Sequence, residues 1–277
     1  MKVLVTGANG MLGQDLCPIL GNNGYSVVKT DIDNLDITNS KMVEAVLNSE
    51  NPDIVIHCAA YTNVDKAEED INTARLINST GTENIAKACS KLNCTLVYVS
   101  TDYVFEGTGT RPYKPQDKTN PLNNYGLTKF EGEEAVRKYC EKYYITRTSW
   151  LYGVHGRNFV ETMISLADKP EIKVVDDQTG CPTWTVELCS GILKLLQFEK
   201  PFGTYHVCGG GFTTWYGFTK EIYKLCNLEV NLHPCTTEEF PRPAKRPVYS
   251  VMDNGGLCRD WKEALQDYIK IREGVRV

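Results

Sequence analysis

The first half of the chain alternates short runs of Val, Ile and Leu with longer segments of helical pattern. The apolar runs fall at residues 2–6, 25–31, 53–59, 95–100 and 143–149. Unbroken apolar runs between helices are typical of a parallel sheet that is covered on both faces. The alternation therefore predicts a doubly wound, Rossmann-type α/β domain with a parallel sheet.

The alternation weakens beyond Trp150. Helical patterns then recur between loops rich in Pro, Gly and Thr, at residues 158–167, 186–197, 216–226 and 260–271. We expect residues 1–150 to form a dinucleotide-binding domain, and residues 151–277 to form mainly a smaller, mixed substrate-binding lobe. This division leaves room for some segments of the second half to return to the main sheet. A chain of 277 residues, 42% of them hydrophobic, is long enough for such a core.

Composition excludes several classes of protein. The net charge of -5 argues against a chain whose role is to coat nucleic acid or anionic lipid. No apolar run approaches the roughly 20 residues that span a bilayer, and the N-terminal segment lacks a secretory signal pattern. The eleven cysteines form no Cys-x-x-Cys pair, and the four histidines are scattered. We therefore expect a cytoplasmic protein with reduced, buried thiols and no metal site.

A glycine-rich segment, "VTGANGMLG", follows the first predicted strand and opens the first predicted helix. Glycines in this place let the backbone approach a pyrophosphate, whose charge is favoured at a helix N-terminus. The spacing G-x-x-G-x-x-G differs from the commoner G-x-G-x-x-G, and a simple tight turn is the alternative interpretation. The strand before it and the helix after it favour a cofactor loop, with contacts from Gly7, Gly10, Met11, Leu12 and Gly13.

An acidic residue, Asp31, ends the second predicted strand. Its carboxylate is placed to accept hydrogen bonds from the adenosine ribose of a dinucleotide, and it would repel a 2′-phosphate. We therefore expect the cofactor to be NADPH or NADH, with NADH at least as acceptable, although Lys29 lies nearby. Asp36 and Ile37 are candidates to flank the adenine; a turn that leads into the next helix explains them equally well.

The third and fourth predicted strands end at the sheet edge where ligands bind in open α/β sheets. Small and polar residues there are candidate cofactor contacts, namely Ala59, Ala60, Tyr61, Thr62 and Val99. Thr101 ends the fourth strand, and its hydroxyl could hold a substrate carbonyl oxygen.

Tyr125 and Lys129 lie four residues apart in "YGLTK", one turn apart on one face of a predicted helix. A free phenol titrates near ~10, so it is a slow proton donor at neutral pH. A neighbouring ammonium stabilises the phenolate, and lowering the phenol pKa by about three units corresponds to ~4 kcal/mol. A solvated helix start is the alternative for an isolated pair. Beside a dinucleotide loop, we favour catalysis by Thr101, Tyr125 and Lys129, the latter two also contacting the cofactor.

Several segments together resemble the extended short-chain dehydrogenase/reductases. These segments are "TGANGMLG", "AAYTNVDKAE", "STDYVF", "PLNNYGLTK", "RTSWLYG" and "DDQTGCPT". They are most similar to the bacterial dTDP-4-dehydrorhamnose reductases, nearly from end to end. The resemblance implies that Thr101 polarises a carbonyl, that Tyr125 donates a proton, and that Lys129 binds the cofactor ribose and activates the phenol. It also implies substrate contacts from Thr101, Asp102, Tyr125 and Trp150.

The activity that the resemblance implies is reduction of the C4 ketone of dTDP-4-dehydro-L-rhamnose to dTDP-L-rhamnose, a step of polysaccharide biosynthesis. Arg242 and Arg246, in the proline-stiffened segment "EEFPRPAKRPVYS", are candidates to bind the diphosphate. A solvated basic loop is the alternative for this segment. Some members of the family carry a metal between subunits, but its acidic ligands have no match here. The sequence leaves open whether the chain forms a homodimer.

Three other functions share parts of this motif set. A nucleotide-sugar dehydratase needs an acid two residues after the strand-four threonine, and Tyr103 occupies that position. A 4-epimerase would retain its cofactor tightly. The regulatory β subunit of methionine adenosyltransferase also resembles these reductases, and in that case the chain would be a binding partner without turnover.

Overall fold

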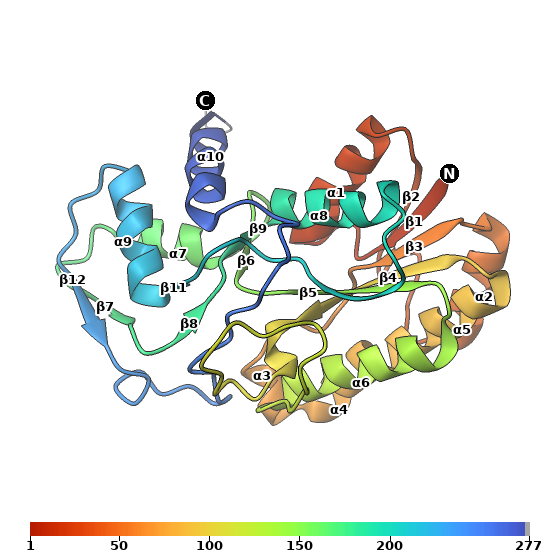
Figure 1. Cartoon of the computed structure of the whole chain (residues 1–277), viewed down its shortest axis with the longest axis horizontal. Helices are drawn as coiled ribbons and strands as arrows, with labels where there is room; N and C mark the ends of the chain where they lie inside the picture. The colour runs from red at the N-terminus through yellow and green to blue at the C-terminus, as the bar shows by residue number, and fades with distance from the viewer. Residues whose placement is uncertain (275–277) are drawn as a thin grey trace.

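The computed structural model describes residues 1–274, and its centre is a six-stranded parallel sheet (Figure 1). From one edge to the other its strands are β10 (Gly203–His206), β5 (Tyr143–Thr148), β4 (Thr95–Thr101), β3 (Ile54–His57), β1 (Lys2–Thr6) and β2 (Ser26–Thr30). The strand order reverses between β1 and β3, and such a reversal opens a crevice at the carboxyl ends of the strands. The predicted doubly wound α/β fold is confirmed.

Helices cover both faces of the sheet (Figure 1). One face carries α1 (Met11–Asn22) and α8 (Thr185–Gln197), and the other carries α2 (Ser40–Glu50), α5 (Thr82–Leu92) and α6 (Asn124–Tyr139). Because both faces are covered, inner-strand residues such as Val3, Leu4 and Val55 have no exposed surface. This is the physical reason for the uniformly apolar runs in the sequence.

Two segments from the second half of the chain join the main sheet. Strand β10 pairs with β5, and α8 packs beside α1 through Leu188, Ile192 and Leu195. These three side chains are spaced as one face of a helix, so they form the apolar stripe that the sheet face requires. The division of the chain at residue 150 stays a prediction.

The helical segment between β3 and β4, residues 71–92, contains an irregular turn. It divides into α4 (Ile71–Arg75), a π-helical turn (Leu76–Gly81) and α5. Asn78 in this turn is buried; its side chain accepts a hydrogen bond from Tyr61 N at 2.8 Å and donates to Tyr61 O and to Thr128 Oγ1. Such π turns occur often at functional sites, and this one places Leu76 and Ile77 at the edge of a cleft.

Elements from the second half of the chain form a smaller lobe beside the sheet (Figure 1). Its members are β6 (Leu151–Tyr152), α7 (Phe159–Ser165), β7 (Ile172–Val175), β8 (Thr179–Gly180), β9 (Thr183–Trp184), β11 (Thr213–Thr214), α9 (Trp215–Leu225), β12 (Leu232–Cys235) and α10 (Trp261–Gly274). Short strand pairs and an aromatic core that includes Tyr152, Phe218, Trp261 and Tyr268 hold it together. Large aromatic side chains let this small lobe bury a substantial apolar area.

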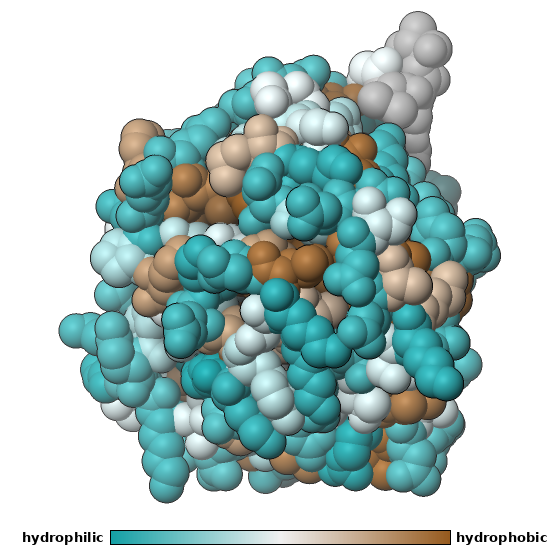
Figure 2. All heavy atoms as spheres, turned by 90° about the vertical axis from the view of Figure 1, so that its right-hand side faces the viewer, coloured by the Kyte–Doolittle hydropathy of each residue, from teal (hydrophilic) through white to brown (hydrophobic). Residues whose placement is uncertain are grey.

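Hydrophilic residues dominate the face shown in Figure 2, and hydrophobic residues appear there only in small, scattered groups. Within residues 1–274, no helix has the length and apolar character needed to cross a membrane. The cysteines are free thiols, and most are buried.

Candidate active site

A cleft of about 1060 Å³ lies at the carboxyl ends of the strands of the main sheet. Its wall includes the glycine-rich segment after β1, the end of β2, the ends of β3 and β4, and the start of α6. The smaller lobe contributes Trp150, Leu151 and Arg157. The cleft therefore lies where the sheet meets the smaller lobe, and a long ligand could contact both.

The glycine-rich segment forms a cradle at the start of α1. Gly7 has a φ of +67°, and a Cβ atom there would lie 2.7 Å from Ala59 N. At Gly13 a Cβ atom would lie 2.6 Å from Ala8 Cα and would also press on the Gly7 carbonyl. The first turn of α1 carries no acidic side chain, so nothing there repels an anion. This cradle fits the pyrophosphate of a dinucleotide.

Asp31 connects the cradle to the end of β2. Its carboxylate accepts hydrogen bonds from Asn9 N at 2.9 Å and from Ile32 N at 2.8 Å, and the residue also lines the cleft. Each carboxylate oxygen has a further lone pair for a ligand hydroxyl. Asp36 and Ile37 line the same end of the cleft, beside the exposed Ile32.

Thr101 and Asp102 lie at the carboxyl end of β4, and both are buried. The Thr101 hydroxyl donates to Asp102 Oδ1 at 3.0 Å and accepts from Tyr103 N at 3.2 Å. Burial raises the pKa of Asp102 to about 6, against the effect of the hydrogen bond from Thr101. At neutral pH this carboxyl group is thus close enough to its pKa to exist in both protonation states.

Tyr125 stands in the first turn of α6, and the sequence around it explains how it reaches the cleft. Asn123 caps the helix by accepting a hydrogen bond from Gly126 N at 2.8 Å. Gly126 lies so close to the backbone of Tyr103 that a Cβ atom would be 2.9 Å from its carbonyl carbon. The Tyr103 and Tyr125 rings meet edge to face, 5.6 Å apart. Glycine is therefore required in "YGLTK" for close packing of α6 against the end of β4.

The phenol of Tyr125 is not acidified in this structure. Burial, assisted by the charge of Asp102, raises its pKa to about 12, while a hydrogen bond with Thr101 acts in the opposite direction. The expected lowering of this pKa by Lys129 is therefore wrong for this structure. The physical reason is that burial of the phenol raises its pKa by more than the Thr101 interaction lowers it. In addition, the Lys129 ammonium donates its hydrogen bond to Val99 O and not to the phenol. The phenol stays protonated at neutral pH and holds a proton to donate.

Lys129 lies one helical turn beyond Tyr125 and lines the cleft, although it is 3% exposed. Its Nζ donates to Val99 O at 2.7 Å and lies 4.2 Å from the centre of the Tyr98 ring. Burial lowers the pKa of Lys129 to about 7, against the opposing charge of Glu133. The side chain is thus fixed at the cofactor end of the cleft and titrates near neutrality.

Trp150 packs against the core of the smaller lobe and lines the cleft. It adopts a left-handed backbone conformation with a φ of +47°, and its ring stacks on Trp215 with 3.5 Å between ring centroids. Trp215 Nε1 in turn donates to Gln178 Oε1 at 3.2 Å. The stack on Trp215 therefore fixes the orientation of the Trp150 indole, as a contact for a sugar ring requires.

The glycine cradle and the Thr101, Tyr125 and Lys129 group share one cleft in a doubly wound fold, and comparison with known proteins identifies the family. The profile of the RmlD substrate binding domain matches residues 1–273.

The chain belongs to the RmlD substrate binding domain family.

Relatives in this family match the chain over nearly its full length. The Spore coat polysaccharide biosynthesis protein SpsK of Bacillus subtilis is 41% identical, over 98% of each chain. The dTDP-4-dehydrorhamnose reductase of Streptomyces griseus is also 41% identical, over 95% of this chain and 91% of the relative. The resemblance to the dTDP-4-dehydrorhamnose reductases that the sequence motifs indicated is thereby confirmed.

Solved structures of the family agree with the fold. A dTDP-4-dehydrorhamnose reductase from Clostridium acetobutylicum superposes with a TM-score of 0.96 at 46% identity, covering 99% of this chain and 100% of the other. The Bacillus anthracis enzyme in complex with NADP gives a TM-score of 0.94 at 42% identity, covering 98% and 99%. More distant neighbours, such as a Thermus thermophilus UDP-glucose 4-epimerase with 20% identity, share the fold alone.

Most site residues predicted from the sequence line the RmlD-family cleft, and three do not. Tyr61 lies on the loop after β3, where both its backbone groups bond to the side chain of Asn78. Arg246 donates to Asp65 Oδ1 at 2.8 Å, and Arg242 approaches the same carboxylate at 3.9 Å. These two arginines join the loop before residue 248 to the start of α3 (Lys66–Glu69), and their contact with substrate stays a prediction.

Other residues line the cleft without a prediction from the sequence. They include Asn9, Ile32, Cys58, Tyr103, Ser149 and Arg157. Arg157 is an exposed cation in the loop between β6 and α7, and a search of that loop for a lone cation would have found it. The π turn at Leu76 gave no sequence signal, because its letters fit an ordinary helix. Within residues 1–274, no three His, Cys, Asp or Glu side chains gather as ligands for a metal.

Proposed function

We propose that this protein reduces the C4 ketone of dTDP-4-dehydro-L-rhamnose to dTDP-L-rhamnose, with NADPH or NADH as reductant, in the cytoplasm. One observation carries the proposal: Thr101, Tyr125 and Lys129 share one cleft with the glycine cradle. The chain is moreover 41% identical to the dTDP-4-dehydrorhamnose reductase of Streptomyces griseus. A homodimer stays a prediction.

The chain's own groups supply positioning and the proton. The Thr101 hydroxyl, buried at the end of β4, would hold the ketone oxygen beside the Tyr125 phenol. The phenol has a pKa of about 12 and is therefore protonated at neutral pH, so it would donate its proton as the oxygen gains charge. When bound, the nicotinamide cofactor supplies the hydride. Trp150, which lines the same cleft, would contact the sugar and help to exclude water from the reacting centre.

Both nicotinamide cofactors are expected to bind. Asp31 lines the cleft with its carboxylate, which favours a ribose hydroxyl over a 2′-phosphate. Among the described residues that line the cleft, the cations are Lys129 and Arg157, and neither lies beside Asp31 in the chain. NADH should therefore serve at least as well as NADPH, which the ratio of kcat/KM for the two cofactors measures.

A panel of 4-keto nucleotide sugars, each assayed with both cofactors, tests the proposed substrate. Highest kcat/KM with dTDP-4-dehydro-L-rhamnose supports it. Another 4-ketosugar is the second candidate, because the dTDP-4-keto-6-deoxy-D-glucose reductase of Streptomyces niveus is 38% identical over 94% of this chain. Turnover on that sugar alone would favour the second candidate. Firm cofactor binding without turnover on any sugar would favour a regulatory subunit, such as the methionine adenosyltransferase β subunit that the motifs also resemble.

A further inference from the structure

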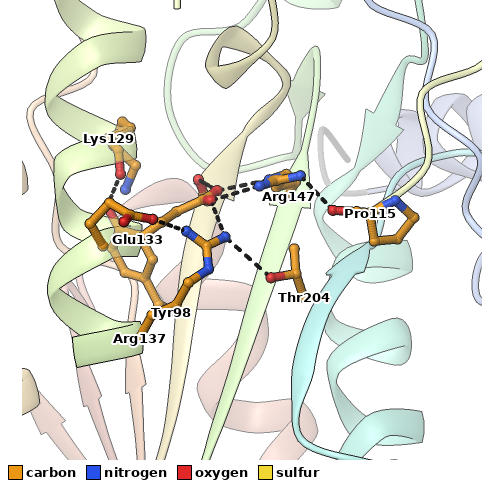
Figure 3. Close-up of polar contacts among 9 residues, drawn as sticks. Tyr98, Pro115, Lys129, Glu133, Arg137, Arg147 and Thr204 are labelled. Carbon is orange, nitrogen blue, oxygen red and sulfur yellow. Dashed lines mark hydrogen bonds and ion pairs between the residues drawn. The ribbon is translucent and has the colours of Figure 1, made fainter. Parts of the chain in front are cut away.

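A buried carboxylate lies one helical turn beyond Lys129. Glu133 on α6 has no exposed surface, and its two oxygens receive four hydrogen bonds (Figure 3). Arg147 on β5 binds it through Nε at 2.8 Å and Nη2 at 2.7 Å, and Arg137 Nη2 binds it at 2.7 Å. The fourth donor is Ser100 Oγ at 2.6 Å. The roles that the resemblance implies for Thr101, Tyr125 and Lys129 do not use this group.

Stability of the fold is a poor explanation for this arrangement. Removing a carboxylate and a guanidinium from water costs several kcal/mol per ion, and well-packed apolar residues of the same volume often stabilise a protein more. The position of Glu133 is informative for another reason. Residues four apart share one helix face, so Tyr125, Lys129 and Glu133 form a row along α6 that faces β4.

The contacts of Lys129 and Glu133 fall on consecutive residues of β4. Lys129 Nζ donates to Val99 O, and Ser100 Oγ donates to Glu133. The Tyr98 hydroxyl also donates to the backbone carbonyl of Lys129 at 3.2 Å (Figure 3). Three successive residues of the strand thus fix the helix at the turn that carries the lysine.

Among the groups around Lys129, Glu133 has a specific electrostatic role, because its charge favours the ammonium form. Facing the ammonium are Glu133 from α6, His57 and Cys58 from the end of β3, and the Tyr98 ring from β4. Burial lowers the pKa of His57 to about 3 and raises that of Cys58 to about 12, so both are neutral at neutral pH. Arg147 holds the pKa of Glu133 below its usual value, so this carboxyl group stays ionised. Of these groups, Glu133 alone offers the ammonium a compensating negative charge.

We propose that Glu133 is a positioning residue: its carboxylate keeps the Lys129 ammonium charged and fixed against β4, and so sets the pH range in which Lys129 can serve ketone reduction. Arg147 contributes to the same positioning, because its guanidinium forms a bidentate pair with the Glu133 carboxylate and holds it in place. The consequence for catalysis rests on the proposed function, whereas the effect on Lys129 does not.

Titration of Lys129 in the protein alone tests the proposal without turnover. Lysine labelled with ¹³C at the ε carbon is followed by NMR from pH 5 to 10, and Lys129→Arg identifies the resonance. The test variant is Glu133→Gln, and the matched control is Glu134→Gln, the same change on the next residue of α6. Glu134 is 57% exposed and contacts Arg137. Glu133→Asp, which keeps the charge, tests for rescue.

In the wild-type protein we expect the midpoint for Lys129 near pH 7. Glu133→Gln should lower it by about one pH unit or more, because an opposing charge at close range is lost. Glu134→Gln should leave the midpoint unchanged within a few tenths, and Glu133→Asp should restore most of the shift. The alkaline limb of kcat/KM should move with the midpoint. An unchanged midpoint in Glu133→Gln overturns the proposal, even if kcat falls.

Loss of one partner leaves Arg147 buried with fewer compensating charges, so Glu133→Gln could be recovered unfolded. The double variant Glu133→Gln/Arg147→Gln removes both charges and carries the same test, with the same two outcomes. A protein that shows the shift but reduces no ketone contradicts the proposed function and leaves the effect of Glu133 on Lys129 standing.

Discussion

Replacing Tyr125 by Phe removes one oxygen atom from the cleft and leaves the ring in place. The ring packs edge to face on Tyr103, and this contact is independent of the hydroxyl. The hydroxyl interacts with Thr101. Because the helix cap at Asn123 and the close approach at Gly126 are untouched, the cleft should keep its shape.

The expected magnitudes differ between stability and turnover. Loss of one hydrogen bond costs about 0.5–1.5 kcal/mol of the free energy of unfolding, which lowers Tm by a few degrees in a chain of this size. Loss of a general acid lowers kcat by about 10²- to 10⁴-fold, or about 3–5 kcal/mol in the activation free energy. Binding of NADH should change less than about threefold, since no cofactor contact depends on proton donation.

The assay follows oxidation of NADH at 340 nm with dTDP-4-dehydro-L-rhamnose, and fluorescence measures the Kd of the cofactor. Tyr103→Phe is the matched control, because it deletes the hydroxyl of the neighbouring ring in the same cleft. The control should lose less than about tenfold in kcat. If Tyr125→Phe retains a kcat within threefold of wild type, or if Tyr103→Phe is the variant that abolishes turnover, Tyr125 is not the proton donor.

Three further changes test other parts of the site. The kcat/KM of the wild-type protein should fall as pH rises above about 7, because the free protein then loses the Lys129 ammonium; a flat profile to pH 9 would contradict this. Gly13→Ala should weaken cofactor binding by about 10- to 100-fold, because its Cβ would overlap the Ala8 backbone and shift the cradle; an unchanged Kd in a calorimetric titration would refute the cradle. Trp215→Ala should raise KM for the sugar by about 2- to 10-fold, because the stack on Trp150 is lost, and kcat should change less. Trp215→Phe should partly restore the wild-type KM; equal KM values in all three proteins would show that the orientation of Trp150 does not depend on Trp215.

Features set by local sequence were predictable. The strand runs and the glycine-rich loop depend on burial and backbone freedom, which act within a few residues, so β1, α1 and the cradle lie where the sequence places them. Helix α6, which was predicted to carry Tyr125 and Lys129 on one face, begins at Asn124, and its cap at Asn123 is a local signal. The carboxyl ends of parallel strands meet at one edge of the sheet, and this rule predicted that Thr101 lies in the cleft, which Lys129 on α6 also lines.

Features set by distant contacts were not predictable. The π turn at Leu76 depends on Asn78 bonding to Tyr61 and to Thr128 of another helix. Helix α8 has an ordinary amphipathic pattern, and nothing in its letters shows whether the stripe meets the main sheet or the smaller lobe.

The pKa of Tyr125 shows the same limit for chemistry. A Tyr-Lys spacing identifies two neighbours, but it gives neither the desolvation of the phenol nor the carbonyl of Val99 that binds the ammonium. Two numbers follow from the three-dimensional surroundings alone: a phenol pKa near 12 and an ammonium pKa near 7. The pair is therefore a protonated donor beside a cation that titrates near neutrality.

The most direct test of the proposed function is the product of a single reaction. Purified protein is incubated with dTDP-4-dehydro-L-rhamnose and NADH or NADPH, and the sugar is identified by NMR. We expect one equivalent of cofactor to be oxidised for each dTDP-L-rhamnose formed. Tight cofactor binding with no cofactor oxidised and the ketosugar recovered intact would contradict a reductase.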